Sequence, residues 1–146
     1  MLIRTALLST IIAALTLFPG AGCARQTHNP ALATRPYPAH LHRAESIDIQ
    51  VFREGTMLEV VNTTPRSYHD FDLWVNQRFV RHVESLPAGE TVRLSLRGFY
   101  DELGEPFRAG GFFRTEKPMP VRLVEMQFSE EQPMIGLITI RAEKAE

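Results

Sequence analysis

From residue 46 onward the chain alternates apolar and polar positions with a period of two. The alternation is clearest at residues 47–51, 71–75 and 92–96. This period places every second side chain on the same face of a β-strand, so each segment offers one face to a core and one to solvent. Further apolar runs bring the number of predicted strands to seven; they lie at residues 57–61, 79–83, 121–128 and 134–140.

The connections between these segments have the composition of tight turns. Gly55 follows a strand and can adopt the positive φ that a hairpin turn needs. Asn76-Gln77 predicts a second tight hairpin, and Pro87 and Gly89 bound a third turn. Short strands with frequent turns over about 100 residues predict an all-β domain at residues 46–146, an antiparallel two-sheet sandwich of about seven strands.

Three short segments also resemble immunoglobulin-like or fibronectin type III-like domains of bacterial envelope proteins. They are LEVVN at residues 58–62, WVN at residues 74–76 and LPAGET at residues 86–91. The resemblance implies an immunoglobulin-like sandwich that binds or spaces other molecules, without naming a ligand. With no disulfide available, such a core depends on apolar burial, and we expect Trp74 at its centre.

The first 22 residues have the organisation of a signal peptide. Arg4 gives the positive start, residues 6–18 are apolar, and Pro19-Gly20 interrupts the apolar stretch. A helix that spans a membrane needs about 20 apolar residues, so the 13 positions from 6 to 18 are too few for a permanent anchor. The segment therefore predicts export.

The end of this leader resembles the lipobox of bacterial lipoproteins. The resemblance lies in Ala21, Gly22 and Cys23, the only cysteine of the chain, while Gly20 stands where the family usually has leucine. It implies cleavage before Cys23 and a lipid on its sulfur, and Ala24 resembles the residue of lipoproteins sorted to the outer membrane, facing the periplasm. The alternative is ordinary cleavage near Gly22 or Ala24, which releases a free periplasmic or secreted protein.

Residues 24–45 have the composition of a flexible tether. They contain Pro30, Pro36 and Pro38 and show no apolar period. Proline favours extended conformers and lacks a backbone donor, so we expect this stretch not to pack. A tether of this kind would separate the domain at residues 46–146 from a membrane.

The longest gap between predicted strands, residues 97–120, is rich in aromatic side chains. We expect a small hairpin at residues 102–104, with Phe99 and Phe107 closing one end of the sandwich. Long loops often carry binding residues. The candidate partner-binding loop comprises Tyr100, Phe112 and Phe113.

Metal and nucleic-acid binding find little support in the chain. His40 and His42 have the spacing of a chelating pair, but no cysteine or carboxylate cluster lies beside them. The formal net charge of -1 gives no field that would attract nucleic acid. We expect no cofactor, and the two histidines are weak metal candidates only.

Enzyme motifs are absent from the sequence. It contains no Gly-x-Ser-x-Gly, no Gly-x-Gly-x-x-Gly and no His-Glu-x-x-His. The leading hypothesis is a non-catalytic envelope lipoprotein that interacts with another envelope protein. The alternative is a glycan- or metal-binding module with Tyr68, Trp74 or Tyr100 as stacking platforms. A small hydrolase would need His69 or His82 in a cleft with a carboxylate and a hydroxyl.

Overall fold

The computed structural model describes residues 35–111 and 117–140. This part of the chain is all-β, with two short 3-10 helices, η2 (Ala39–Leu41) and η3 (Leu96–Gly98). Its strands are β1 (Ser46–Glu54), β2 (Met57–Asn62), β3 (Tyr68–Val75), β4 (Phe79–Leu86), β5 (Thr91–Ser95), β6 (Val124–Gln127) and β7 (Ile135–Ile140). The prediction of an all-β domain with seven strands is confirmed for the described residues.

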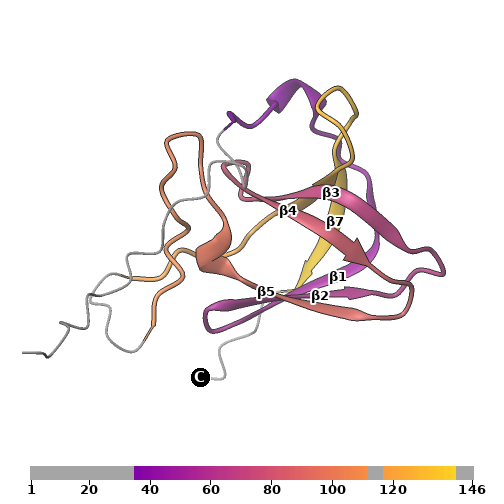
Figure 1. Ribbon diagram of the computed structural model, residues 1–146, viewed down its shortest axis with the longest axis horizontal. Helices are drawn as coiled ribbons and strands as arrows, with labels where there is room; N and C mark the ends of the chain where they lie inside the picture. The colour runs from indigo at the N-terminus through magenta and orange to yellow at the C-terminus, as the bar shows by residue number, and fades with distance from the viewer. Residues whose placement is uncertain (1–34, 112–116, 141–146) are drawn as a thin grey trace, which may run out of the picture.

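The strands form one mixed sheet in the order β4-β3-β6-β7-β1-β2-β5. All neighbours are antiparallel except β1 and β7, which run parallel. The expected sandwich had two separate antiparallel sheets, whereas here β1 pairs on both sides and its pairing with β7 shifts register between Ile47 and Gln50. The sheet therefore continues from one half of the domain into the other (Figure 1).

The curved sheet is nearly closed where its edge strands β4 and β5 approach each other. The chain leaves β5 through η3 and reaches Tyr100, whose backbone N–H and C=O exchange hydrogen bonds with Val80 of β4 at 3.1 and 2.8 Å. This bridge occupies the edge of β4 that would otherwise stay open. The domain is thus barrel-like in outline.

The main hydrophobic core lies inside this curve. It takes Ile49 and Leu58 from one half of the sheet, Phe71 and Met126 from the other, and includes Phe107. Phe99 belongs to the same cluster, so the prediction that Phe99 and Phe107 pack into the domain is confirmed. The hairpin predicted between them is also present, since Phe107 N–H donates to Phe99 C=O at 2.8 Å.

Trp74 is fully buried, but it does not lie in the main core. It forms a second, smaller cluster with Val80 and Met134, against which Tyr37 and Leu41 pack. The prediction that Trp74 lies at the centre of the core is therefore wrong: the residue is buried, but outside the main core. Along β3 the inward positions belong to Phe71, Leu73 and Val75, so the side chain of Trp74 points to the opposite, outer face.

Residues 35–42, which we call the strap, lie against that outer face. The sequence assigns them to the tether, yet Tyr37 and Leu41 pack on the Trp74 cluster. The strap contains no strand, and η2 buries none of its residues. Its contacts are made with strands far along the chain, so no local apolar period indicates them. The tether residues 24–34 lie outside the described residues.

Candidate functional site

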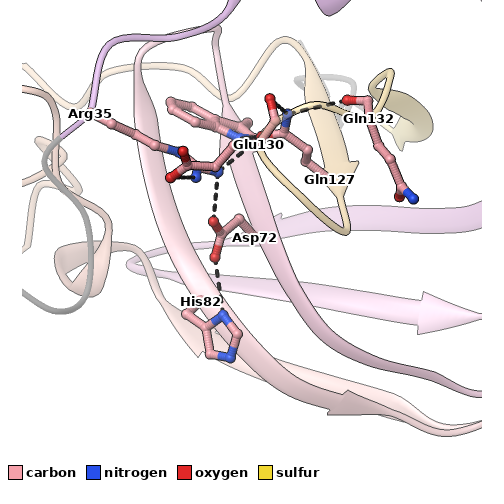
Figure 2. Close-up of polar contacts among 7 residues, drawn as sticks. Arg35, Asp72, His82, Gln127, Glu130 and Gln132 are labelled. Atoms are coloured by element: carbon pink, nitrogen blue, oxygen red, sulfur yellow. Dashed lines mark hydrogen bonds and ion pairs between the residues drawn. The ribbon is translucent and has the colours of Figure 1, made fainter.

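The strap and the outer face of β3, β4 and β6 enclose two of the four buried polar residues of the described chain, Glu125 and Gln127. Cross-strand pairing sets Asp72 opposite His82 on one side and opposite Gln127 on the other. Trp74 is likewise opposite Glu125. These side chains share one face of the sheet, and the strap covers it from the solvent side. Figure 2 shows part of this network around Arg35.

Arg35, at the start of the strap, is held by three acceptors and one aromatic ring. Its Nη2 donates to Asp72 Oδ2 at 2.7 Å and to Gln127 Oε1 at 2.9 Å, while Nη1 donates to Glu130 Oε1 at 2.8 Å (Figure 2). Its Cζ lies 5.4 Å from the centre of the Trp74 ring. Stacking and branched hydrogen bonding are the two interactions that distinguish a guanidinium from an ammonium group.

Asp72 and Gln127, two of the acceptors that hold Arg35, are themselves fixed by the domain. Trp74 Nε1–H donates to Gln127 Oε1 at 3.2 Å, and Gln127 Nε2 donates to the carbonyl of Gln132 at 3.2 Å. On the other side, His82 Nδ1 lies 3.0 Å from Asp72 Oδ1. Asp72 and Gln127 are therefore positioned by contacts that do not involve Arg35.

The second half of the strap covers a buried carboxylate. Glu125 has 0% of its surface exposed, and it accepts a hydrogen bond from Tyr37 Oη at 2.9 Å. His42 Nδ1 lies 2.7 Å from the other carboxylate oxygen. Burial raises the pKa of the Tyr37 hydroxyl, and the hydrogen bond to Glu125 raises it further, so this hydroxyl stays protonated and donates.

The structure brings together only some of the residues singled out in the sequence. Cys23, Phe112 and Phe113 lie outside the described residues. Tyr100 is buried, with 6% of its surface exposed, so it does not present a ring to solvent as the candidate partner-binding loop requires. The reason is its backbone bridges, which hold Tyr100 between Val80 at the edge of β4 and Pro106.

The residues proposed for glycan stacking or metal binding do not form a common site among the described residues. Trp74 is fully buried, which removes the stacking platform that a glycan site would need there. The ring of Tyr68 packs 6.1 Å from that of Phe128. His40 is exposed and His42 faces Glu125. Within residues 35–111 and 117–140, no group of three or more His, Cys, Asp or Glu is arranged to hold a metal.

His82 has the carboxylate partner that the hydrolase hypothesis requires, in the form of Asp72. Asp70 Oδ1 lies 3.9 Å from its other ring nitrogen. The hydrogen bonds that we find for His82 among the described residues join it to Asp72 alone, with no hydroxyl group. His82 also belongs to the network around Arg35, because its partner Asp72 accepts from Arg35 Nη2.

A second ion pair stabilises the hairpin after Tyr100. Asp101 is buried and accepts hydrogen bonds from Arg78 Nε at 3.0 Å and Nη2 at 2.6 Å. Its other oxygen accepts from the backbone N–H of Leu103 at 3.0 Å and of Glu105 at 2.8 Å. Burial acts to raise the pKa of Asp101, but these donors outweigh it and hold the pKa below its ordinary value.

No pattern in the sequence singles out Arg35, Glu125 and Gln127 as site residues. Glu125 and Gln127 lie in the apolar run at residues 121–128, and polar side chains at alternate positions of such a run indicate a solvent-facing side. The available signal was Trp74, because a tryptophan at a polar position of an alternating strand is either an exposed binding platform or covered by another segment. Arg35 carried no signal, since nothing local distinguishes it from the other arginines.

Comparison with known proteins does not assign the site. No protein family, no curated protein and no solved structure gives a significant match to this chain. Among the described residues, none of the helices has the length and apolar character needed to cross a membrane.

Proposed function

We propose that the protein is an exported, non-catalytic envelope lipoprotein, anchored by a lipid on Cys23, whose β domain interacts with another envelope protein. The leader and the cysteine that follows it support the anchor. Contacts from Arg35 to the sheet fix the point where the chain that follows Cys23 reaches the domain. The outer membrane, facing the periplasm, is the proposed location.

We further propose that the fold is of the immunoglobulin-like type. The order β1-β2-β5 corresponds to strands A, B and E of such domains, and β3-β6-β7 corresponds to C, F and G. β4 then takes the place of C′. In this arrangement the parallel pairing of β1 with β7 joins two sheets that would otherwise be separate. Domains of this architecture serve widely as binding modules, which agrees with the proposed role.

The interaction proposal rests on how the domain holds the two ends of residues 109–119, which we call the aromatic loop. Arg53 donates to the carbonyl of Ala109 at 2.8 Å and to that of Met119, so one guanidinium joins both ends of the loop. Arg97 donates to the carbonyl of Gly110 at 3.0 Å. Rigid scaffolds that fix the base of a loop commonly support binding loops. We therefore keep Phe112 and Phe113, directly beyond this base, as the proposed contact residues.

Replacing both Phe112 and Phe113 with serine is expected to leave folding intact and to abolish partner recovery. The free energy of unfolding, measured with urea, should change by less than about 0.5 kcal/mol, as for surface substitutions. Crosslinking in intact cells followed by mass spectrometry measures how much partner protein is recovered with each variant. Phe107→Ser is the matched control. Because Phe107 is buried, this substitution should destabilise the domain strongly. A comparable loss of stability in the double variant would assign the two side chains to the core instead.

Replacing Cys23 with serine is expected to abolish membrane association. The lipid would be carried by the cysteine sulfur, and a serine hydroxyl cannot replace it in this modification. Detergent-phase partitioning of the full-length protein measures the anchor, and intact mass of the wild type measures the added lipid. Recovery of the Cys23→Ser protein in the detergent phase at the wild-type level would contradict the lipoprotein proposal.

A further inference from the structure

We propose that the outer face of β3 and β6 is a guanidinium-binding site, filled by Arg35 in the free protein and open to an arginine side chain of a partner when the strap leaves. The acceptors are Asp72, Gln127 and Glu130, and the ring of Trp74 forms the floor. In taking a protein as the external ligand we rely on the protein-binding role proposed above. The guanidinium chemistry follows from the contacts of Arg35 alone.

The acceptors fit a planar, branched cation better than a compact one. The two terminal nitrogens of Arg35 bind oxygens on different elements: Nη1 binds Glu130 after β6, and Nη2 binds Asp72 on β3. The plane of a guanidinium can lie over an indole while its edges donate in several directions. An ammonium group is a compact, strongly hydrated charge, so it could not bind the acceptors on both elements at the same time.

Two of the three acceptors and the ring are held in place without Arg35. Gln127, of which 1% is exposed, is held by the indole N–H of Trp74 and by the carbonyl of Gln132. Asp72 keeps its contact with His82. Trp74 rests on Val80 and Met134. A site preorganised in this way retains affinity for a replacement cation, because little further ordering is required.

The backbone of the strap is hydrogen-bonded to the rest of the domain at its far end. In the described residues, its backbone hydrogen bond to the sheet region runs from Met134 N–H to the carbonyl of Leu41, at 2.8 Å. Nearby, Gly136 N–H donates to the carbonyl of Glu45 at 3.0 Å. The first half is attached through the side chains of Arg35 and Tyr37. Residues 35–38 can therefore leave while the Leu41 end stays in place.

Chemical replacement of the missing side chain tests the site. The full-length Arg35→Ala protein is titrated with methylguanidinium up to tens of millimolar at constant ionic strength, with methylammonium as the matched cation. Trp74, the only tryptophan, reports the occupancy of the site through its fluorescence. We expect a red shift on substitution, and a saturable reversal with a rise in the unfolding midpoint on adding methylguanidinium. The wild type should not respond.

Two further variants make the test specific. Arg43→Ala is the matched control, because Arg43 also precedes β1 but donates to the carbonyls of His40 and His42. It should leave the fluorescence unchanged and show no response. Adding Asp72→Asn to Arg35→Ala should abolish the methylguanidinium effect. If Arg35→Ala cannot be purified, Arg35→Lys serves in its place, and methylguanidinium should still shift its fluorescence whereas methylammonium should not.

An equal response to both cations, or none to either, would overturn the guanidinium site. This outcome would leave the predictions for Cys23 and for the aromatic loop unaffected. For the partner, a peptide with a single arginine should compete with methylguanidinium for Arg35→Ala, and the same peptide with lysine should not. Failure of the peptide alone, with methylguanidinium effective, would overturn the external protein ligand and keep the internal role of Arg35.

Discussion

Replacing Trp74 with alanine is expected to destabilise the domain by about 3–5 kcal/mol. The indole is fully buried between the sheet and the strap, with the Tyr37 ring packed edge-on at 5.4 Å. Its removal leaves a cavity and deprives Gln127 of a donor. Urea unfolding followed by circular dichroism measures the effect, since the substitution removes the only tryptophan fluorophore.

Two controls separate burial from loss of the indole N–H. Trp74→Phe keeps a ring in place but not the donor to Gln127, so it should fall between the wild type and Trp74→Ala. Leu103→Ala removes an apolar side chain that is 77% exposed and should change the free energy of unfolding by less than about 0.5 kcal/mol. A Trp74→Ala protein as stable as Leu103→Ala would show that the strap does not cover the sheet in solution.

The substitution should also act on Arg35. Trp74 is the floor beneath the guanidinium, so its loss weakens the same set of contacts that Arg35→Ala removes. The two changes share partners and are expected not to add: the double variant should be more stable than the sum of the single effects indicates. Strict additivity would mean that the ring and the cation stabilise the domain independently.

The strands were predictable because their signal is local. At residues 71–75 the alternation of Phe71, Leu73 and Val75 with Asp72 marks the inward positions, and the structure buries these three in the core. The short turn at Asn76-Gln77 was predictable for the same reason, and both residues adopt positive φ. Such features depend on neighbours within a few residues, which a single sequence displays directly.

The arrangement of the strands depends on contacts that the alternation does not contain. The parallel pairing of β1 with β7 joins the first and last strands, so no turn between them indicates it. The strap shows the same limit: Tyr37 meets Glu125, 88 positions further along the chain. A proline-bearing stretch has the composition of a linker whether or not a distant surface receives it.

Trp74 contained part of the missing information. It shares the outward parity of Asp72 on β3, so alternation alone predicts a large aromatic on the solvent side. A tryptophan there is either exposed, as a stacking platform, or covered by another segment. The sequence left these possibilities open, and the packing of the strap decides for burial.

Replacing Asp101 with asparagine is expected to cost about 2–3 kcal/mol at neutral pH. An amide can still accept from the N–H groups of Leu103 and Glu105, but its nitrogen would face the guanidinium of Arg78, donor against donor. Glu105→Gln is the matched control, because Glu105 is exposed and lies 3.6 Å from the same guanidinium. That control should cost less than about 0.5 kcal/mol.

The pH dependence identifies the charge of Asp101 as the source of this stability. Its pKa in the folded protein is lowered, so the stability that it contributes is fully present above the pKa of an unfolded aspartate, about 3.9, and is lost as the pH falls through the folded pKa. The difference in free energy of unfolding between the wild type and Asp101→Asn should therefore stay constant from pH 7 to about 5 and narrow below about 4. A difference that persists unchanged to pH 2 would assign the effect to the shape of the hairpin rather than to the ion pair with Arg78.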